Sequence, residues 1–244
     1  MKHWGALAAL LAVLSLVTLG GIYVSLPPSP PSELATRGPV TAVPTGSVIS
    51  YIVSLPGQPV VLINSGDEPN VSALLSALGE LNRAPEDVKA ILLTHGSYDH
   101  SHGLKRFPKA TVYASSDDLN LADHVRRISS ALPRLRMRLF GRPERPQRMR
   151  TVLPGERITI GSLVFDSLPL PGVTAGSLAY RYDRFVFVGD SLWPTEQGLE
   201  PPSGLWLERA SELRHSLSRL ESWEGDWIAT SRGGFSEMPA SWSP

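Results

Sequence analysis

The sequence predicts an α/β sandwich built from two successive halves, each made of strands followed by a helix. Two observations carry this prediction. Short runs rich in Val, Ile and Leu alternate with segments of helical spacing from residue 47 to residue 244. The same order of strands and then a helix occurs twice, which favours two packed sheets over one parallel sheet. The stretch holds about 200 residues, which suits a single domain.

Each half contributes several short strands and few helices. The expected strands of the first half are residues 47–54, 59–64, 90–93 and 110–114. Its expected helices are residues 71–81, with Asn70 as the N-cap, and residues 116–131. The second half is expected to hold strands at 157–160, 163–168, 177–182, 184–188 and 227–230, and a helix at 205–221. The first two strands flank a Pro-Gly-Gln turn, which is typical of a hairpin.

The N-terminal part is predicted to be a membrane anchor and a linker. The run from Trp4 to Val24 is uncharged and would span about 31 Å as a helix, close to the thickness of a bilayer core. Residues 1–24 are therefore expected to be an uncleaved signal anchor, with Lys2 on the cytoplasmic side. This gives a single-pass protein of the cell membrane with its globular domain outside the cytoplasm. The alternative is cleavage after Gly20 and secretion.

Residues 25–46 contain six prolines and are predicted to be a semi-extended linker to the domain at 47–244.

The amino-acid composition limits the chemistry that this domain can carry out. The chain has no Cys, which excludes disulfide scaffolds, thiolate metal sites and cysteine nucleophiles. Any metal must therefore be held by His, Asp, Glu or hydroxyl groups.

The net charge of zero hides an uneven distribution. Lys and Arg together number 23, as do Asp and Glu, yet residues 126–150 hold nine Arg against one Glu. This Arg-rich insertion is either a solvated loop or a surface that binds an anionic ligand such as lipid headgroups. No nucleic acid partner is expected, because the domain is predicted to lie outside the cytoplasm.

A cluster of histidines follows the strand at 90–93. Three of the six His fall within residues 94–102, whose sequence is THGSYDHSH. His and Asp side chains in one loop after a strand offer nitrogen and oxygen ligands for a divalent ion such as zinc. A lone His would be an ordinary surface or core residue, but three with an Asp between them predict a metal site.

This loop resembles the Thr-His-x-His-x-Asp-His motif of the metallo-β-lactamase-fold hydrolases, matched at Thr94, His95, Asp99 and His100. Three further landmarks of that family occur in the same order. They are residues 63–66 (INSG) for its Asp-Thr-Gly segment, 170–177 (LPGVTAGS) for its Pro-Gly-His segment and 186–191 (VFVGDS) for its Gly-Asp segment. The resemblance covers roughly residues 45–235 and implies a four-layer αβ/βα sandwich with a metal site at one edge.

The ligand positions that the resemblance implies are only partly retained. The positions of the first metal are His95, Ser97 and Val173, those of the second are Asp99, His100 and Arg232, and the bridging carboxylate is Asp190. Ser97, Val173 and Arg232 are thus lost ligands. Asn64 also replaces the supporting carboxylate of the Asp-Thr-Gly segment.

The retained residues predict at most one metal ion. Asp99, His100 and Asp190 could hold one zinc or another divalent ion, with His95 as a further ligand and His102 as a weaker one. Alternatively no ion binds, and Arg232 pairs with Asp99 and Asp190 to supply the positive charge. If an ion binds, Asp99 is expected to orient a water, while Tyr98 or Ser97 stabilises an oxyanion.

Two functions remain open from the sequence. The first is a membrane-tethered, mononuclear metal-dependent hydrolase acting outside the cytoplasm. The second is a pseudoenzyme without turnover, which binds an anionic ligand through its Arg-rich surface.

Overall fold

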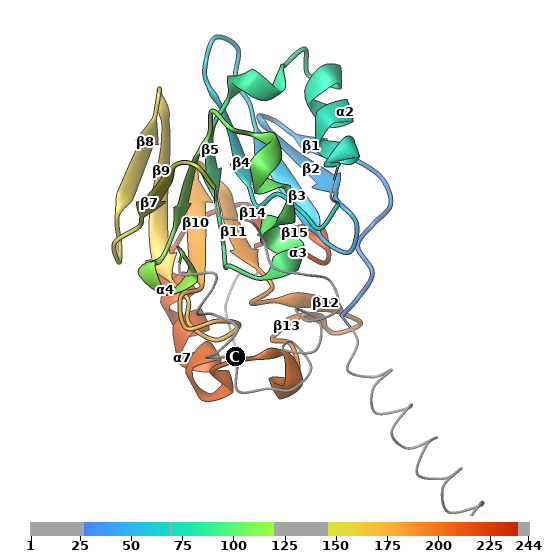
Figure 1. Cartoon of the computed structure of the whole chain (residues 1–244). Coiled ribbons are helices and arrows are strands. Elements are labelled where there is room, and N and C mark those ends of the chain that lie inside the picture. The colour runs from blue at the N-terminus through green and yellow to red at the C-terminus, as the bar shows by residue number, and fades with distance from the viewer. Residues whose placement is uncertain (1–26, 69, 120–145, 239–244) are drawn as a thin grey trace, which may run out of the picture.

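The computed structural model describes residues 27–68, 70–119 and 146–238. Two sheets lie face to face, with helices on their outer faces (Figure 1). This arrangement confirms the α/β sandwich that the sequence predicts. A separate two-stranded ribbon is inserted within the second half.

The first sheet has seven strands in the order of the chain, from β1 to β7. They are β1 (Ala35–Arg37), β2 (Val40–Pro44), β3 (Ile49–Val53), β4 (Val60–Ile63), β5 (Val88–Leu92), β6 (Thr111–Ala114) and β7 (Met149–Thr151). The pairs from β1 to β4 are antiparallel, and those from β4 to β7 are parallel. Both faces of the central strands are covered, so β3 and β4 are buried along their whole length.

The second sheet has six strands in the order β15-β14-β11-β10-β9-β8. They are β8 (Arg157–Ile160), β9 (Leu163–Pro169), β10 (Leu178–Tyr182), β11 (Phe185–Gly189), β14 (Trp227–Thr230) and β15 (Gly234–Glu237). Only the β11–β14 pair is parallel. The separate ribbon pairs β12 (Trp193–Thr195) with β13 (Gly198–Glu200).

Helices cover the outer face of each sheet. On the first sheet these are α2 (Ser72–Glu80), α3 (Tyr98–Ser101) and the 3₁₀ helices Pro85–Asp87 and His102–Arg106, with α4 (Ser116–Leu119) after β6. On the second sheet they are α7 (Ala210–Ser218) and the 3₁₀ helices Gly204–Trp206 and Arg219–Ser222. Leu74 and Leu78 of α2 pack on the first sheet, and Leu213 and Leu217 of α7 pack on the second. The four layers implied by the resemblance are therefore present.

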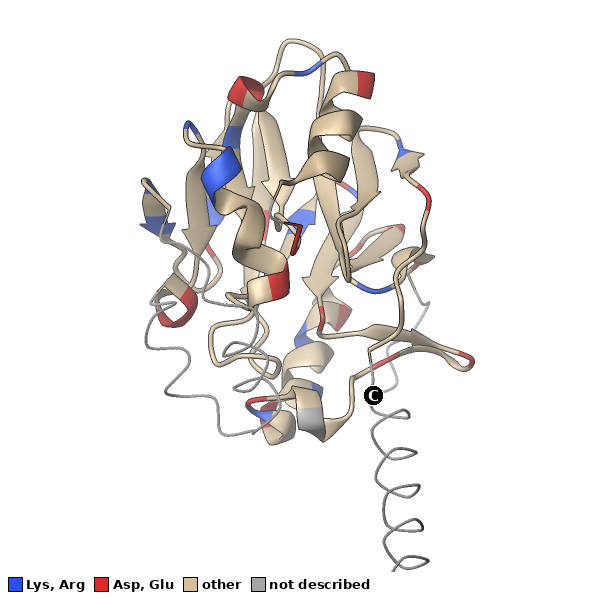
Figure 2. Ribbon diagram, turned by 45° about the vertical axis from the view of Figure 1, so that its right-hand side comes forward, with Lys and Arg blue, Asp and Glu red and all other residues tan. Residues whose placement is uncertain are grey.

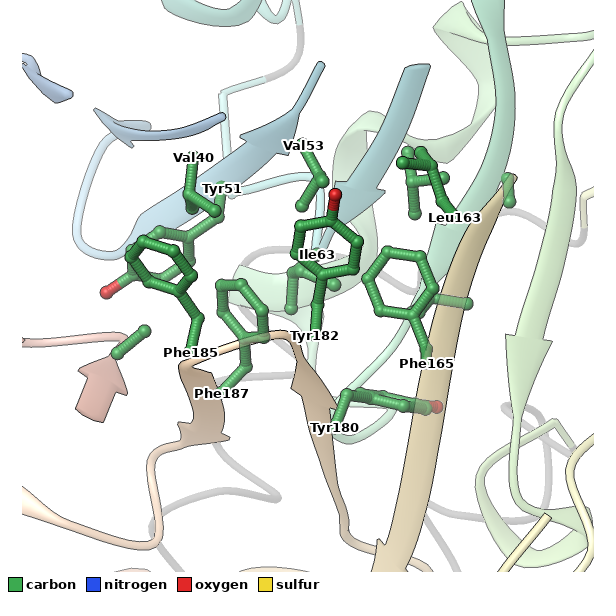
Figure 3. Packing of buried hydrophobic residues seen from close by; sticks show 14 of the residues in the cluster. Val40, Tyr51, Val53, Ile63, Leu163, Phe165, Tyr180, Tyr182, Phe185 and Phe187 are labelled. Atoms are coloured by element: carbon green, nitrogen blue, oxygen red, sulfur yellow. The ribbon is translucent and has the colours of Figure 1, made fainter. Parts of the chain in front are cut away.

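The core between the sheets is rich in aromatic side chains. Phe187 of the second sheet points toward Tyr51 of the first, with the ring centroids 5.3 Å apart, and Phe165, Tyr180 and Ile63 belong to the same cluster (Figure 3). The Tyr51 hydroxyl donates a hydrogen bond of 2.6 Å to the carbonyl of Thr230, across the interface between the sheets. This bond ties the middle of β3 to the end of β14, next to the turn that carries Arg232.

Two predictions about helix ends were wrong, one for α2 and one for α7. Asn70 does not cap α2; the N-cap is Val71, in a left-handed conformation, and the Glu68 carboxylate accepts a hydrogen bond from the amide of Ala73. The helix expected at 205–221 is shorter, with its regular part limited to α7. The amides of Glu208 and Arg209 donate to the carbonyls of Val173 and Gly172, so this stretch pairs with a loop instead of continuing a helix.

The predicted linker at 25–46 must also be corrected. Its second part forms β1 and β2, which belong to the first sheet. The high proline content of the whole segment concealed the short run of Val40 to Val43, whose side chains are all buried. The folded unit therefore begins before residue 47.

Three predictions fall outside the described residues. They are the signal anchor at 1–24, most of the Arg-rich insertion at 126–150, and the helix expected at 116–131 beyond α4. Within the described ranges, no helix has both the length and the apolar character needed to cross a bilayer.

We expect Tyr51→Phe to lower the free energy of unfolding by about 1–2 kcal/mol, because it leaves the buried Thr230 carbonyl without this donor. Urea unfolding measures the change. Tyr182→Phe is the matched control, since the Tyr182 hydroxyl has no hydrogen bond to a described residue and the side chain is also buried. Equal losses in the two variants would contradict the role given to the Tyr51 bond.

Candidate metal centre

The first histidine of the centre follows the end of β5. Thr94 and His95 are buried there, and Asn64 at the end of β4 holds the segment. The Asn64 side chain donates to the Thr94 hydroxyl at 3.0 Å and accepts a bond of 3.0 Å from the Thr94 amide. An amide can both donate and accept, which a carboxylate cannot. Asn64 thus keeps a supporting role although it lacks the expected charge.

The short helix α3 brings Asp99 and His100 beside His95. The His100 backbone carbonyl accepts a 2.8 Å bond from the amide of Ser65, which fixes the helix against the end of β4. The His100 ring lies against the His95 ring, with their centroids 4.0 Å apart. Its Nε2 is 2.9 Å from the Ser231 hydroxyl, and its Nδ1 is 3.3 Å from Asp99 Oδ1.

Asp190 reaches the centre from the second sheet, directly after β11. Gly189 makes this approach possible, because its φ is +61° and a Cβ there would lie 2.4 Å from the Thr94 hydroxyl. The ends of β5 and β11 therefore come closer than a larger residue would allow. As a result Asp190 Oδ1 lies 3.7 Å from His100 Nε2.

Arg232 occupies the turn between β14 and β15 and binds both carboxylates. Its Nε and Nη2 donate to the two oxygens of Asp190 at 3.0 and 2.8 Å, and Nη2 also donates to Asp99 Oδ2 at 2.9 Å. Its Nη1 donates to the Ser47 carbonyl at 2.6 Å. The ion pairs predicted for Arg232 are therefore present. Figure 2 marks the charged positions along the ribbon, and the side chains of Arg232, Asp99 and Asp190 are among those that are buried.

The charges in this cluster stabilise one another. Burial by itself raises the pKa of Asp190, but the attraction of Arg232 and His100 outweighs it, so the pKa lies below its ordinary value of 3.8. Burial likewise lowers the pKa of Arg232, yet Asp190 and Asp99 raise it well above its ordinary value. Arg232 and Asp190 are consequently both charged at neutral pH.

His95, His100 and Asp190 form a group that could hold a metal ion. One side-chain nitrogen or oxygen of each lies within 4.8 Å of those of the other two, and all three residues are buried. Two imidazoles and a carboxylate are donors that zinc accepts, and three protein ligands with an open position are typical of catalytic zinc sites. The donor set therefore fits one divalent ion.

This group differs from the set that the sequence favours. Asp99 is not part of it: its Oδ2 accepts a hydrogen bond from Arg232, and the third member of the group is His95. His102 also lies apart: its Nδ1 is 3.0 Å from the Asp67 carbonyl, and its ring packs on Tyr98 with the centroids 4.4 Å apart.

The lost ligand positions have other contacts. Val173 is half-buried and packs against the hydrophobic cluster that includes the leucines of α7, and its carbonyl accepts a bond from the amide of Glu208. Ser97 is the N-cap of α3, where its carbonyl accepts bonds from the His100 amide and the Ser101 hydroxyl. Neither side chain belongs to the His95–His100–Asp190 group.

Sequence reasoning missed two partners of the centre, Ser231 and Ser47. Ser231 stands next to Arg232, and its hydroxyl lies within hydrogen-bond distance of His100. Ser47 contributes its backbone carbonyl, which no side-chain pattern could reveal. The position of Ser231 beside a residue of the centre was the only available signal.

The sequence of the chain is similar to those of known hydrolases. The chain is 25% identical over 146 residues to the probable polyketide biosynthesis zinc-dependent hydrolase BaeB of Bacillus velezensis, covering 59% of this chain and 55% of that protein. It is 27% identical over 176 residues to the hydroxyacylglutathione hydrolase of Hamiltonella defensa, covering 70% of this chain and 55% of that protein. The chain thus spans little more than half the length of these relatives.

Solved structures show the same fold at low identity. The metallo-beta-lactamase family protein TTHA1429 of Thermus thermophilus superposes with a TM-score of 0.66 at 22% identity, covering 83% of this chain and 76% of that chain. A B3 metallo-beta-lactamase with an active-site glutamic acid gives a TM-score of 0.65 at 21% identity, covering 87% and 83%. The profile of the metallo-beta-lactamase superfamily matches residues 43–226. Because this match covers most of its length, the chain belongs to the metallo-beta-lactamase superfamily.

Proposed function

We propose that the protein is a mononuclear metal-dependent hydrolase whose ion is held by His95, His100 and Asp190. The observation that carries this proposal is the convergence of these three buried donors within 4.8 Å. Superfamily relatives that are zinc-dependent hydrolases support it at a coarse level. The sequence-based set of Asp99, His100 and Asp190 is thereby replaced by one in which Asp99 has a different role.

Arg232 limits the site to one ion. Its guanidinium bonds to both Asp99 and Asp190, the carboxylates that a second ion would need. A second divalent ion beside this fixed cation would be repelled, and Asp99 is already paired. The charge that a second metal would provide is supplied by the arginine itself.

The residues of the chain have distinct tasks in this proposal. A bound divalent ion supplies Lewis acidity and lowers the pKa of a water. Arg232 holds Asp99 through a hydrogen bond to its Oδ2, and Asp99 could accept a proton from a water in the site. Asn64 and Thr94 hold the backbone before His95, and Ser231 orients the His100 ring. Tyr98 and Ser97 remain our proposed donors to an oxyanion.

A second candidate function is supported by the same ion pairs. With Arg232 bonded to both carboxylates, the buried cluster already contains a cation for its two anions. A protein of this kind could keep its fold without an ion and act as a binding protein without turnover. In that case the Arg-rich segment 126–150 would be the anion-binding surface, for example for lipid headgroups.

For both candidate functions we propose that residues 1–24 anchor the chain in the cell membrane, with the domain outside the cytoplasm.

We expect the purified full chain to bind about one equivalent of zinc, and His95→Ala and His100→Ala each to reduce the bound metal below about 0.2 equivalents. Elemental analysis after removal of excess zinc measures this, together with turnover of a 4-nitrophenyl ester and of bis(4-nitrophenyl) phosphate. His215→Ala, on the exposed face of α7, is the matched control and should retain the metal.

Two equivalents of zinc in the unsubstituted chain would contradict the role of Arg232. Metal content that is substoichiometric and equal in all variants, with no turnover, would exclude the hydrolase and leave the binding protein.

We expect Arg232→Gln to invert the pH dependence of stability. In the unsubstituted chain the lowered pKa of Asp190 contributes stability above the ordinary value of 3.8, and this is lost as the pH falls through the lowered value. Without the arginine, burial raises the pKa of the Asp190 carboxyl. The free energy of unfolding of the variant is then highest at about pH 4 and decreases toward pH 7. At pH 7 it is about 3–5 kcal/mol lower than that of the unsubstituted chain. Urea unfolding with a chelator at pH 4, 5.5 and 7 measures both curves.

The control is Arg184→Gln, which breaks the exposed ion pair with Asp226 and should change stability little at any of these pH values. A loss for Arg232→Gln that is independent of pH would show that Arg232 acts through packing and not through its charge.

A further inference from the structure

A cavity of about 600 Å³ lies beside Arg232. Its described lining residues are Pro27, Pro28, Ser29, Pro30, Pro31, Ser32, Pro44, Gly46, Ser47, Trp206 and Arg232. The volume is in the range of small-molecule sites, which are concave and largely apolar. Through Arg232 the cavity is one side chain away from Asp190, a residue of the proposed metal group.

The segment of residues 27–32 behaves as a wall of this cavity. A spacer surrounded by solvent would be exposed along its length, yet Pro27, Pro28 and Pro30 are half-buried. Proline rings are apolar and hold the backbone in a narrow range of φ, so this wall loses little entropy when a ligand binds. The segment that the sequence predicts to be a linker therefore contributes a surface to the domain.

Trp206 gives the cavity an aromatic surface. It ends the 3₁₀ helix Gly204–Trp206 and packs against Trp193, with the ring centroids 6.0 Å apart. Trp193 in turn lies 5.8 Å from the guanidinium carbon of Arg232. The uncharged rings of Trp206 and Trp193 thus form a series of contacts from the cavity to Arg232.

The charge of the cavity favours an uncharged ligand. Arg232 is the one charged side chain among the described lining residues, and it is bonded to Asp99 and Asp190. An anionic group entering the cavity would lose its hydration and find an arginine that is already neutralised. Apolar groups, by contrast, would gain contact with proline rings and an indole.

We propose that this cavity is a subsite for an uncharged aliphatic or aromatic group of the substrate, remote from the bond that reacts, with residues 27–32 and Trp206 as its binding surfaces. Its assignment to a substrate rests on the proposed hydrolase function. Binding energy gained at such a remote group can be used to position the reacting bond. The binding of an apolar group itself needs neither metal nor turnover.

A matched pair of dyes tests this inference on the full chain. N-phenyl-1-naphthylamine is uncharged, and 8-anilinonaphthalene-1-sulfonate is a similar arylamine with an anionic group; both gain fluorescence in apolar surroundings. We expect the uncharged dye to bind at least about tenfold more tightly than the sulfonate, and Trp206→Ala to weaken its binding about fivefold. Substitution of Pro27, Pro28 and Pro30 together by Ser should have a similar effect.

The control variants are Trp223→Ala and Pro201→Ser, which remove a half-buried Trp and a half-buried Pro that do not line this cavity. Both should bind the uncharged dye as the unsubstituted chain does. All proteins are measured in one buffer, so partitioning of a dye into detergent cancels between variants, and a protein-free titration of each dye is subtracted before the two dyes are compared. Unchanged binding in Trp206→Ala and in the triple Pro variant, or equal affinity for the two dyes, would overturn the inference.

Zinc content measured on the same samples separates this inference from the proposed function. Trp206→Ala should keep the metal content of the unsubstituted chain, because Trp206 is not in the metal group. If the chain binds no zinc but the dye results hold, the cavity remains an apolar binding site and only the hydrolase proposal fails.

Discussion

The buried guanidinium of Arg232 is the interaction on which the organisation of the centre depends. It joins four segments that are distant in the sequence: the β2–β3 turn through the Ser47 carbonyl, α3 through Asp99, the end of β11 through Asp190, and its own turn after β14. Both sheets contribute to this set. Because each of these charges is buried, each requires its partner, so the two halves of the sandwich are held in register where the donor groups converge.

An arginine and a metal ion can neutralise the same carboxylates, but they differ in how they are held. An ion is shared with the solvent, and its occupancy follows its concentration and the pH. A guanidinium is covalently attached and keeps its charge across the physiological range. The cluster therefore has one permanent cation and, beside it, a group of donors suited to a single exchangeable ion.

The sequence predicted the large elements well and some contacts of the centre. The β3–β4 hairpin and the helix in α2 follow from periodicity, and the pairing of Arg232 with two carboxylates follows from charge at a ligand position. The grouping of His95 with His100 and Asp190 depends on the orientation of side chains from two sheets, which spacing along the chain does not specify. The strands β1 and β2 were missed because the prolines around them outweighed a short buried run.

The position of β1 and β2 before the rest of the sheet has a consequence for where the chain can be cut. β2 pairs with the edge of β3, whose five residues are all buried, and β1 pairs with β2. A fragment beginning at residue 47 would leave a buried strand with its backbone groups unpaired, a surface that readily pairs with other chains and aggregates. The stretch of residues 35–44 thus protects an edge of the sheet, and it belongs to any fragment meant to fold.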